Sequence, residues 1–473
     1  MLADLAITQV RIIGASELAT ICDMGARHAL GFLESTLPAE LAECLSLRAK
    51  QSLRTDIRRQ LSRITRAAYK LEARSHELAL QALGLAARAN RRVELPQPIE
   101  PARMQQRLSS MLQRFPELAH LWLHLISQWQ RHIREVLVRF GTDRRELAGL
   151  LFADELPAKI TDIRPSLSEP HHGGRTVTHL VLDTGSVIYK PRTGDSEWEW
   201  NDLMRWMNKQ SFKPALRPVE VLRRKSYCWM EYIEAARCKD KAAARRFFER
   251  LGGLIAAAHV LKAVDCHREN LIASGEWPIL VDADALWHVS PLTKTQSVTN
   301  VFYRTGFFPN RRRQSLQSRS SVLGPAAAGF HLPHLNGKPA RPHLFAREIV
   351  NGFEAAWLAL LGTAARRASL QRRLRRIRSG PRRWIYRATA TYAAILQESL
   401  QPALLRSATE RAALIRQRCE SQAFSPAVLE AEVASLLKLD IPYFIRRTNE
   451  WLPPDKATPP SEVIEAIYEA LLW

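Results

Sequence analysis

The sequence predicts an α+β protein in which a mixed core is flanked by helical N-terminal and C-terminal regions. Apolar residues recur at helical spacing near both ends and alternate at strand spacing between residues 173 and 192. The pattern changes from helical to mixed near Pro165. We therefore expect three parts: a helical region at 1–165, a core at 166–290, and a loop followed by helices at 291–473.

The N-terminal region contains two helical patterns. The stretch at 118–140 is so apolar in its first half that it predicts a buried helix. Three prolines (Pro96, Pro98 and Pro101) indicate a break between two groups of helices. The other pattern places apolar residues on one helix face: Leu53, Ile57, Leu61, Ile64, Ala68 and Leu71.

The core reads as a series of short elements. Alternating apolar residues around an Asp-Thr-Gly-Ser turn predict a β-hairpin at 173–192. Further along, the pattern predicts a helix at 195–208, strands at 217–222 and 227–233, a long helix at 247–264, and a short buried strand at 279–281.

Composition limits the class of protein. The chain has 473 residues, and 69 Lys and Arg against 47 Asp and Glu give a net charge of +22. Such a charge attracts nucleic acid, nucleotide phosphates, anionic lipid or an acidic peptide. The six cysteines form no CxxC pair, so we expect no zinc and a reducing cytoplasmic location. No apolar segment has the length and lack of charge of a transmembrane helix.

Four residues of the core match the requirements of phosphoryl transfer. Lys190 ends the second hairpin strand and would hold nucleotide phosphates. Asp265 follows the long helix and would orient or deprotonate the attacking hydroxyl. Asn270 and Asp282 would hold Mg²⁺ between the phosphates. Each residue alone could cap a helix or end a strand, but their order and spacing together favour an ATP- and Mg²⁺-dependent site.

The form Asp-x-His-x-x-Asn at 265–270 resembles lipid kinases of the phosphoinositide 3-kinase type more than the His-Arg-Asp loop of protein kinases. The resemblance implies a lipid-kinase-like α/β catalytic core. The sequence has no clean GxGxxG loop, and Gly173-Gly174 is a weak substitute.

Longer segments resemble the dehydratase domain of class II lanthipeptide synthetases (LanM). The matching segments, in the order of that family, are GGRTVTHLVLDTGSVIYKPR, RRFFERLGGLIAAAHVLKAVDCHRENLIASGEWPILVDADALWH, YRTGFFP, PRRWIYRATATY and LDIPYF. The resemblance implies ATP-dependent phosphorylation of Ser and Thr in a ribosomal precursor peptide with a leader segment, followed by elimination of phosphate. It also implies that His267 supports the phosphoryl group and that Asp284 stands where the family has a metal-binding Glu.

The resemblance also implies residues for the elimination step. The pattern P-x-R-x-I-x-R-x-T-x-x-Y at 381–392 assigns phosphate handling to Arg383 and Thr389. The motif G-D-x-H-x-x-G-R reads S-E-P-H-H-G-G-R here, so His171 matches the family histidine and Glu169 replaces an Asp. Because small misplacements of catalytic groups can cost about a hundredfold in rate, this departure concerns elimination rather than phosphorylation.

Full-length members of that family also carry a C-terminal cyclase with a Cys/Cys/His zinc site. The sequence offers no such ligand set, since Cys419 is the only cysteine in its last two hundred residues. We therefore expect a dehydratase without the cyclase, with a separate cyclase as a candidate partner.

Alternatives remain open at this point. Glu169 motivates a peptide kinase that stops at the phosphoester. The absent cyclase motivates a non-catalytic peptide-binding partner of another enzyme, against which the intact Lys190, Asp265, Asn270 and Asp282 argue. A nucleic-acid binder ranks below these, because no nucleic-acid motif accompanies the arginines.

Overall fold

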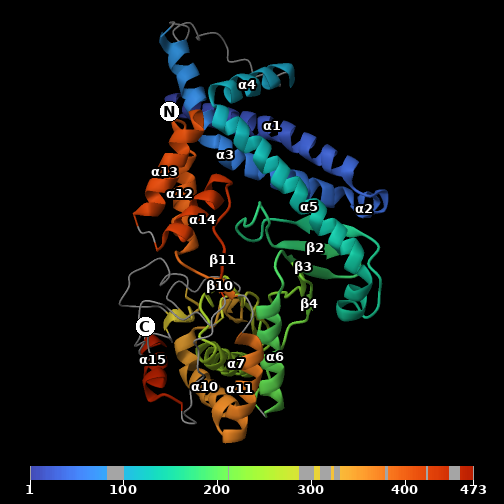
Figure 1. Cartoon of the computed structure of the whole chain (residues 1–473), viewed down its shortest axis with the longest axis vertical. Helices are drawn as coiled ribbons and strands as arrows, with labels where there is room; N and C mark the ends of the chain where they lie inside the picture. Colours follow the sequence, from blue (N-terminus) through green and yellow to red (C-terminus); the bar gives the residue numbers. More distant parts are fainter. Residues whose placement is uncertain are drawn as a thin grey trace. The chain divides into compact units, whose positions relative to one another are not determined.

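The computed structural model describes residues 2–82, 101–210, 212–286, 303–308, 321–323, 331–378, 382–421, 424–446 and 459–471. They form two compact units, and each unit is built from two separate segments of the chain (Figure 1). Unit 1 comprises Met1–Pro191 and Tyr386–Tyr443, and unit 2 comprises Arg192–Ile385 and Phe444–Trp473. This division differs from the three continuous parts expected at 1–165, 166–290 and 291–473, because the chain enters unit 1 a second time.

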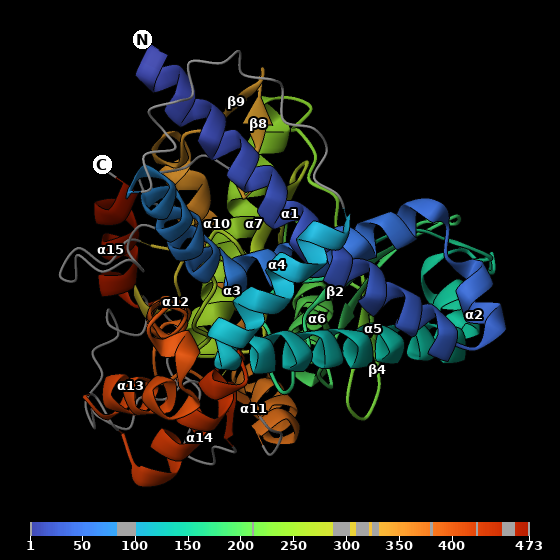
Figure 2. The same cartoon turned by 90° about the horizontal axis from the view of Figure 1, so that it is seen from above.

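Long helices dominate the first segment of unit 1, with α1, α3 and α5 packed together (Figures 1 and 2). The apolar face expected along α3 is buried from Leu53 to Ala68, whereas Leu71 is exposed. The helices are α1 (Leu2–Thr36), α2 (Ala39–Cys44), α3 (Leu47–Ala82), α4 (Pro101–Arg114) and α5 (Pro116–Leu151).

Helix α5 covers the expected buried stretch at 118–140 and extends it at both ends. Pro116 stands in its first turn, where the missing N–H of proline costs no helical hydrogen bond. Its buried face meets α3, where the indole Nε1 of Trp129 donates to the buried carboxylate of Asp56 over 3.0 Å. Residues 83–100, which include Pro96 and Pro98, lie outside the described residues, and α4 begins at Pro101.

Three antiparallel strands complete this segment. The expected hairpin forms β2 (Thr178–Leu182) and β3 (Ser186–Lys190), with Thr178 opposite Tyr189. Strand β1 (Ile160–Arg164) pairs with β2, so the expectation of helix up to residue 165 is wrong for its last residues. Ile160 and Ile163 are fully buried there, and a strand pairing supplies hydrogen bonds that a short sequence after α5 cannot supply alone.

The second segment of unit 1 is helical. It contains α12 (Thr389–Ser399), the 3₁₀ turn η3 (Leu404–Arg406), α13 (Ala408–Glu420) and α14 (Pro426–Leu437). A buried carboxylate joins α12 to α14: Glu432 accepts hydrogen bonds from Arg387 over 2.7 Å and from Tyr392 over 2.6 Å. Arg387 and Tyr392 of the 381–392 pattern therefore have structural partners.

Unit 2 is centred on two helices, α7 (Lys241–Val260) and α10 (Ala346–Leu361), which lie against each other (Figure 2). Glycines permit the close approach: a Cβ at Gly252 would lie 2.0 Å from the carbonyl oxygen of Ile349. The bounds 247–264 expected for α7 are wrong by several residues. Asp240 caps the helix by accepting from the N–H of Ala243, which starts it earlier.

The helix expected at 195–208 and the strands expected at 227–233 and 279–281 are present close to those bounds, whereas the strands at 271–274, 334–335 and 338–339 were not expected. The strand expected at 217–222 begins only at Val221, and the strands β10 and β11 in the region expected to be helical were not predicted. Over the described residues, none of the helices combines the length and the apolarity needed to cross a bilayer. The elements are α6 (Asp195–Lys209), β4 (Val221–Arg223), β5 (Cys228–Glu231), β6 (Leu271–Ser274), β7 (Trp277–Leu280), β8 (His334–Leu335), β9 (Lys338–Pro339), η2 (Pro342–Phe345), α11 (Ala364–Arg378), β10 (Arg382–Trp384), β11 (Phe444–Arg446) and α15 (Ser461–Leu471).

Candidate functional site

A short hairpin in unit 2 brings two expected metal-binding residues together. Strands β6 and β7 pair antiparallel with Leu271 opposite Leu280, so the residues just outside them are neighbours. Asn270 precedes β6 and Asp282 follows β7 by one residue. The carbonyl of Asn270 accepts from the N–H of Val281 over 2.9 Å, which extends the ladder by one step. The hairpin therefore brings Asn270 and Asp282, which are twelve positions apart in the sequence, close together in space.

The loop before this hairpin holds Asp265 in an unusual backbone conformation. Asp265 has a φ of 67°, a left-handed value that is uncommon for a residue other than glycine. The amide Nδ2 of Asn270 donates to the Asp265 carbonyl over 2.8 Å, and the N–H of Cys266 donates to the Thr305 carbonyl over 2.8 Å. Both bonds come from residues of the recognised segments. Strain that the surroundings fix in this way is typical of functional loops.

Three carboxylates gather at this place: Asp265, Asp282 and Asp284, here called the acidic cluster. Arg383 joins two of them, since its Nη1 lies 3.5 Å from Asp265 Oδ2 and 3.4 Å from Asp284 Oδ2. Arg192 forms an ion pair with Asp282, and its Nη1 lies 3.5 Å from Asp284 Oδ2. Two arginines thus offset part of the charge of three carboxylates, and Arg192 also binds Glu197 of α6.

Charges within the cluster shift the pKa of its members. Burial alone would raise the pKa of Asp265, but the hydrogen bond from His267 and the charges of His267 and Arg383 outweigh it and lower that pKa. His267 Nε2 lies 3.3 Å from Asp265 Oδ1, and this contact raises the pKa of His267 against the effect of burial. Asp284 differs: burial and the neighbouring Asp282 raise its pKa. Of these two carboxylates, Asp265 is therefore the one held in the ionised form.

The donor set suits magnesium. Asn270, Asp282 and Asp284 offer amide and carboxylate oxygens, which this hard cation prefers. Among the described residues, no three His, Cys, Asp or Glu side chains form a preassembled metal cluster. Mg²⁺ usually takes one or two protein carboxylates and completes its shell with water and substrate phosphates.

The expected nucleotide lysine lies in unit 1. Lys190 is the last residue of β3, and 4% of its surface is exposed. The sequence left open which glutamate pairs with it, with Glu197 and Glu199 as candidates. Both lie on α6 of unit 2, where Glu197 binds Arg192 and Glu199 pairs with Arg382 over 2.5 Å. Burial raises the pKa of Glu199 to about 7.

The residues expected for elimination are distributed over both units. Glu169 and His171 lie on a loop at 168–175 of unit 1, here called the histidine loop, and Thr389 begins α12 in the same unit. Arg383 lies on β10 in unit 2, in contact with the acidic cluster. Pro381, which opens the same family pattern, lies outside the described residues.

The histidine loop is anchored by the segment that follows α14. Asp440 accepts from the consecutive N–H groups of Gly173 over 2.6 Å and Gly174 over 2.8 Å. Both glycines have positive φ, and a Cβ at Gly174 would lie 2.7 Å from Gln128 Cβ, so glycine is required there. His171 Nδ1 lies 2.6 Å from the Ile441 carbonyl.

This last contact fixes the tautomer of His171. A carbonyl oxygen can only accept, so Nδ1 carries the proton and Nε2 of the neutral ring has the lone pair. A histidine in this tautomer can take a proton at Nε2. Glu169, in contrast, is exposed, and among the described residues no contact of its carboxylate is recorded.

Two residues of the site were missed from the sequence. Arg192 follows Lys190 by two positions within the recognised KPR end of the hairpin, and that was its only signal. Asp440 stands in the recognised LDIPYF segment, but its partners lie more than 260 positions earlier in the chain. Only the pairing of distant segments shows what Asp440 does.

Comparisons with known proteins point to one family. The model of a family described as "Domain of unknown function (DUF4135)" matches residues 115–330 and 324–447. A curated protein, "Lacticin 481/lactococcin biosynthesis protein LcnDR2" of Lactococcus lactis subsp. lactis, is 25% identical over 131 residues. The aligned part is 26% of this chain and 14% of that protein, so the match spans a small part of the relative.

Proposed function

The chain belongs to the DUF4135 family, and on this basis and that of the acidic cluster we propose that it is a lanthipeptide-type dehydratase. The proposed substrate is a ribosomal precursor peptide with a leader segment. ATP would phosphorylate Ser and Thr hydroxyls of this peptide, and elimination of phosphate would leave dehydroalanine and dehydrobutyrine. The printed name of the relative, which places it in the biosynthesis of lacticin 481 and lactococcin, supports a role in peptide modification.

One observation carries the first half-reaction: the grouping of Asp265, His267, Asn270 and Asp282 around one hairpin of unit 2. This grouping supports a lipid-kinase-like catalytic core. Asp265, held in the ionised form, would accept the proton of the peptide hydroxyl. At the same time the hydroxyl oxygen would bond to the γ-phosphorus of ATP, and ADP would leave. His267 would donate to the transferred phosphoryl group, and Lys190 would hold nucleotide phosphates. Mg²⁺ held by Asn270, Asp282 and Asp284 would neutralise charge on the phosphates.

The second half-reaction requires a base and donors for the departing phosphate. The base removes the α-proton, the electron pair forms the Cα–Cβ double bond, and the C–O bond to phosphate breaks. His171, with its Nε2 lone pair, would act as that base. Arg383 and Thr389 would donate to the leaving phosphate, with Glu169 supporting His171. A separate cyclase remains a candidate partner for later ring formation.

The experiment is incubation of the purified chain with a Ser/Thr-rich precursor peptide, ATP and Mg²⁺, followed by mass spectrometry. A dehydratase gives peptide lighter by one water for each residue modified. The control omits ATP, and a second control replaces Mg²⁺ by a chelator. Peptide that stays unchanged although ATP is bound would contradict the proposal.

A second candidate function is a peptide kinase that stops at the phosphoester. The replacement of the family Asp by Glu169 favours it, because the longer side chain changes the position of the carboxylate that the resemblance assigns to elimination. In the same experiment this kinase would give only peptide heavier by phosphate.

A further inference from the structure

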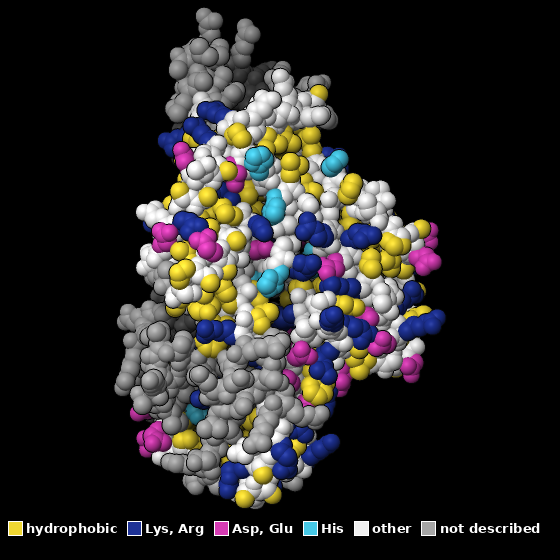
Figure 3. All heavy atoms as spheres, viewed as in Figure 1, with side chains coloured by type: hydrophobic (Ala, Val, Ile, Leu, Met, Phe, Trp, Pro, Cys, Tyr) yellow, Lys and Arg dark blue, Asp and Glu magenta, His cyan; other side chains and the backbone are white. Residues whose placement is uncertain are grey.

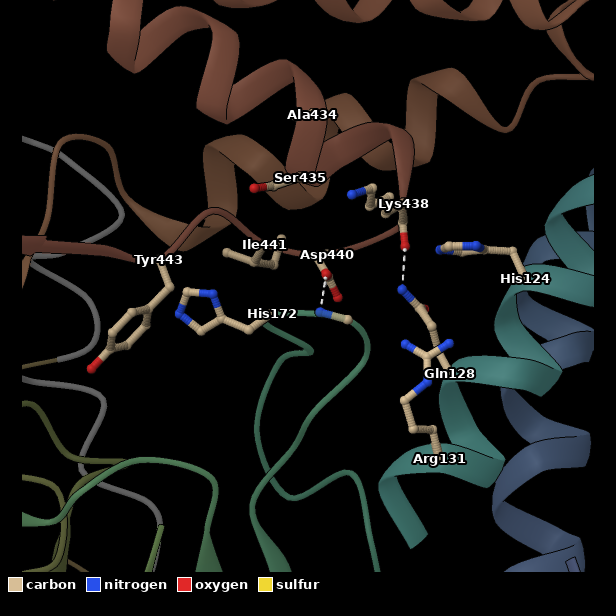
Figure 4. Close-up of a pocket in the computed structure, with 11 residues that line it drawn as sticks. His124, Gln128, Arg131, His172, Ala434, Ser435, Lys438, Asp440, Ile441 and Tyr443 are labelled. Carbon is tan, nitrogen blue, oxygen red and sulfur yellow. Dashed lines mark hydrogen bonds between the residues drawn. The ribbon is translucent and has the colours of Figure 1, made fainter. Parts of the chain in front are cut away.

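A cavity of about 350 Å³ lies in unit 1 beside the histidine loop, and no role has been given to it so far. Its volume is at the lower end of the range for small-ligand sites, roughly 300 to 1,000 Å³. Three chain segments form it: α5, the histidine loop, and the end of α14 with the residues after it (Figure 4). The polar residues that line it are His124, Gln128, Arg131, His172, Ser435, Lys438, Asp440 and Tyr443.

Two cations of this lining have no carboxylate partner among the described residues. The recorded hydrogen bond of the Arg131 guanidinium is a long one, 3.4 Å to the Ser127 hydroxyl. The Lys438 ammonium has no recorded ion pair within the described part of the chain, although its backbone carbonyl accepts from Gln128 over 3.3 Å. Both side chains are exposed at the cavity, so their charge is available to a ligand. Figure 3 shows Lys, Arg and His side chains gathered on this face of unit 1.

The single carboxylate of the lining is already engaged. Asp440 is 3% exposed, and its two oxygens accept from the N–H groups of Gly173 and Gly174. It therefore holds the loop in place rather than neutralising Arg131 or Lys438.

Two imidazoles also line the cavity. The Nε2 atom of His124 is buried without a hydrogen-bond partner, which leaves a polar atom of the lining unsatisfied. Burial first, and then the charges of Lys438 and Arg131, lower the pKa of His124, although Asp440 opposes them. Burial likewise lowers the pKa of His172, which packs edge-on against Tyr443 at 5.3 Å between ring centroids. Both imidazoles are therefore neutral near pH 7, and the positive charge of the lining is that of Arg131 and Lys438.

We propose that this cavity binds a phosphate dianion through Arg131, Lys438 and the imidazole of His172. A guanidinium and an ammonium match the two charges of a phosphate monoester, and an imidazole N–H of His172 can donate to a remaining oxygen. The phosphate can be the ester on a peptide Ser or Thr, or the free ion after release. The assignment of the phosphate to a peptide ester or to the released ion rests on the proposed function. The binding of an anion is inferred from the lining residues alone.

The test is calorimetric titration of the full chain with inorganic phosphate, a short phosphoserine peptide, and the same peptide with glutamate in place of phosphoserine. A saturating non-hydrolysable ATP analogue with Mg²⁺ is present, so that the nucleotide site does not contribute. Arg131→Gln with Lys438→Gln should weaken phosphate and phosphopeptide binding at least tenfold. The control Arg145→Gln removes an exposed charge of the same helix outside the cavity and should change affinity less than twofold.

The titrations distinguish the two sources of phosphate and include results that would overturn the proposal. Phosphopeptide that binds at least tenfold more tightly than inorganic phosphate identifies the ester as the ligand, and equal affinities identify the free ion. Equal or tighter binding of the glutamate peptide would overturn the proposal, as would unchanged affinity in the double variant. Because no turnover is needed, the titration can succeed even if peptide dehydration is never observed.

Discussion

The acidic cluster of unit 2 and the histidine loop of unit 1 differ in the sign of the charges that surround them. In the cluster, Asp265, Asp282 and Asp284 supply negative charge, and two arginines offset part of it. At the histidine loop, cations line a cavity and the one carboxylate, Asp440, is engaged by backbone N–H groups. A cluster rich in carboxylates suits cations and a proton to be accepted, whereas a basic cavity suits an anionic product.

The two regions also differ in how the chain builds them. The three carboxylates of the acidic cluster come from twenty consecutive residues at 265–284, which include one tight hairpin, while Arg192 and Arg383 contact them from distant positions in the chain. The histidine loop depends on residues 440 and 441, which lie about 270 positions later in the chain. Local assembly makes the first region recognisable in sequence, while the second exists only after long-range pairing.

Asp265→Ala should abolish peptide phosphorylation, with a loss of about a thousandfold or more, because a positioned proton acceptor contributes roughly 10² to 10⁴. Phosphorylation is measured by mass spectrometry of the peptide over time. The matched control is Asp202→Ala, which removes another ion-paired carboxylate of unit 2, bound to Arg373 outside the cluster. A variant that modified peptide at near the normal rate would remove Asp265 from the catalytic machinery.

His171→Ala should separate the two half-reactions, and Arg383→Ala should not. Loss of His171 leaves the acidic cluster intact, so phosphopeptide should accumulate while elimination falls about a hundredfold or more. Arg383 contacts Asp265 and Asp284, so its removal should slow both steps.

The readout for this pair is the ratio of phosphorylated to dehydrated peptide, with circular dichroism as a check on folding. Arg406→Ala, an exposed arginine of unit 1, serves as the control. If Arg383→Ala slowed only elimination, its contact with the cluster would have no part in phosphorylation.

Acid should destabilise both units, since each contains neutral buried histidines. Burial lowers the pKa of His132 in unit 1 to about 3 and that of His259 in unit 2 to about 4. The unfolded chain binds these protons near pH 6.5. Stability is therefore complete above pH 6.5 and falls by a few kcal/mol as pH drops toward 4.

Melting temperature and hydrogen exchange, recorded between pH 7.5 and pH 4.5, check this prediction separately for each unit. Loss of protection in only one unit would show that the histidines of the other become solvated before they titrate. A melting temperature that stayed constant over this range would contradict the prediction.

Asp440→Asn should loosen the histidine loop and lower the free energy of unfolding by about 1 to 3 kcal/mol. The amide NH₂ group cannot accept a hydrogen bond, so one of the two glycine N–H groups loses its acceptor. Phosphorylation should stay within about twofold of normal, while elimination slows. The control is Asp183→Asn, since Asp183 also accepts from two consecutive N–H groups, of Ala158 and Lys159, but at an exposed turn. Equal destabilisation by both variants would show that burial of Asp440 is not the cause.

Glu169→Asp should have the smallest effect, less than about tenfold on elimination, because an exposed carboxylate can adjust its position in ways that a buried one cannot. The ratio of phosphorylated to dehydrated peptide over time is compared for the natural chain, Glu169→Asp and Glu169→Ala. Three coinciding ratios would withdraw Glu169 from the site. A loss near a hundredfold would show that substrate fixes this carboxylate tightly.

The sequence by itself determined the features that depend on near neighbours. Helical periodicity identified the buried face of α3 from Leu53 to Ala68, and alternation identified the β2–β3 hairpin. Asp265, Asn270 and Asp282 could be grouped from their order and spacing in the chain, and the β6–β7 hairpin that joins the last two was seen only in the structure. The family resemblance added Arg383 and His171, but not their surroundings.

Only the tertiary structure decided where distant residues go. It placed Arg383 beside Asp265 and Arg192 between Asp282 and Asp284, and it gave Asp440 to the histidine loop. Strands β1, β10 and β11 were missed for the same reason, since a short strand is stabilised by its partner rather than by its own sequence. Periodicity reports which face of an element is buried, but it carries no information about which distant segment covers that face.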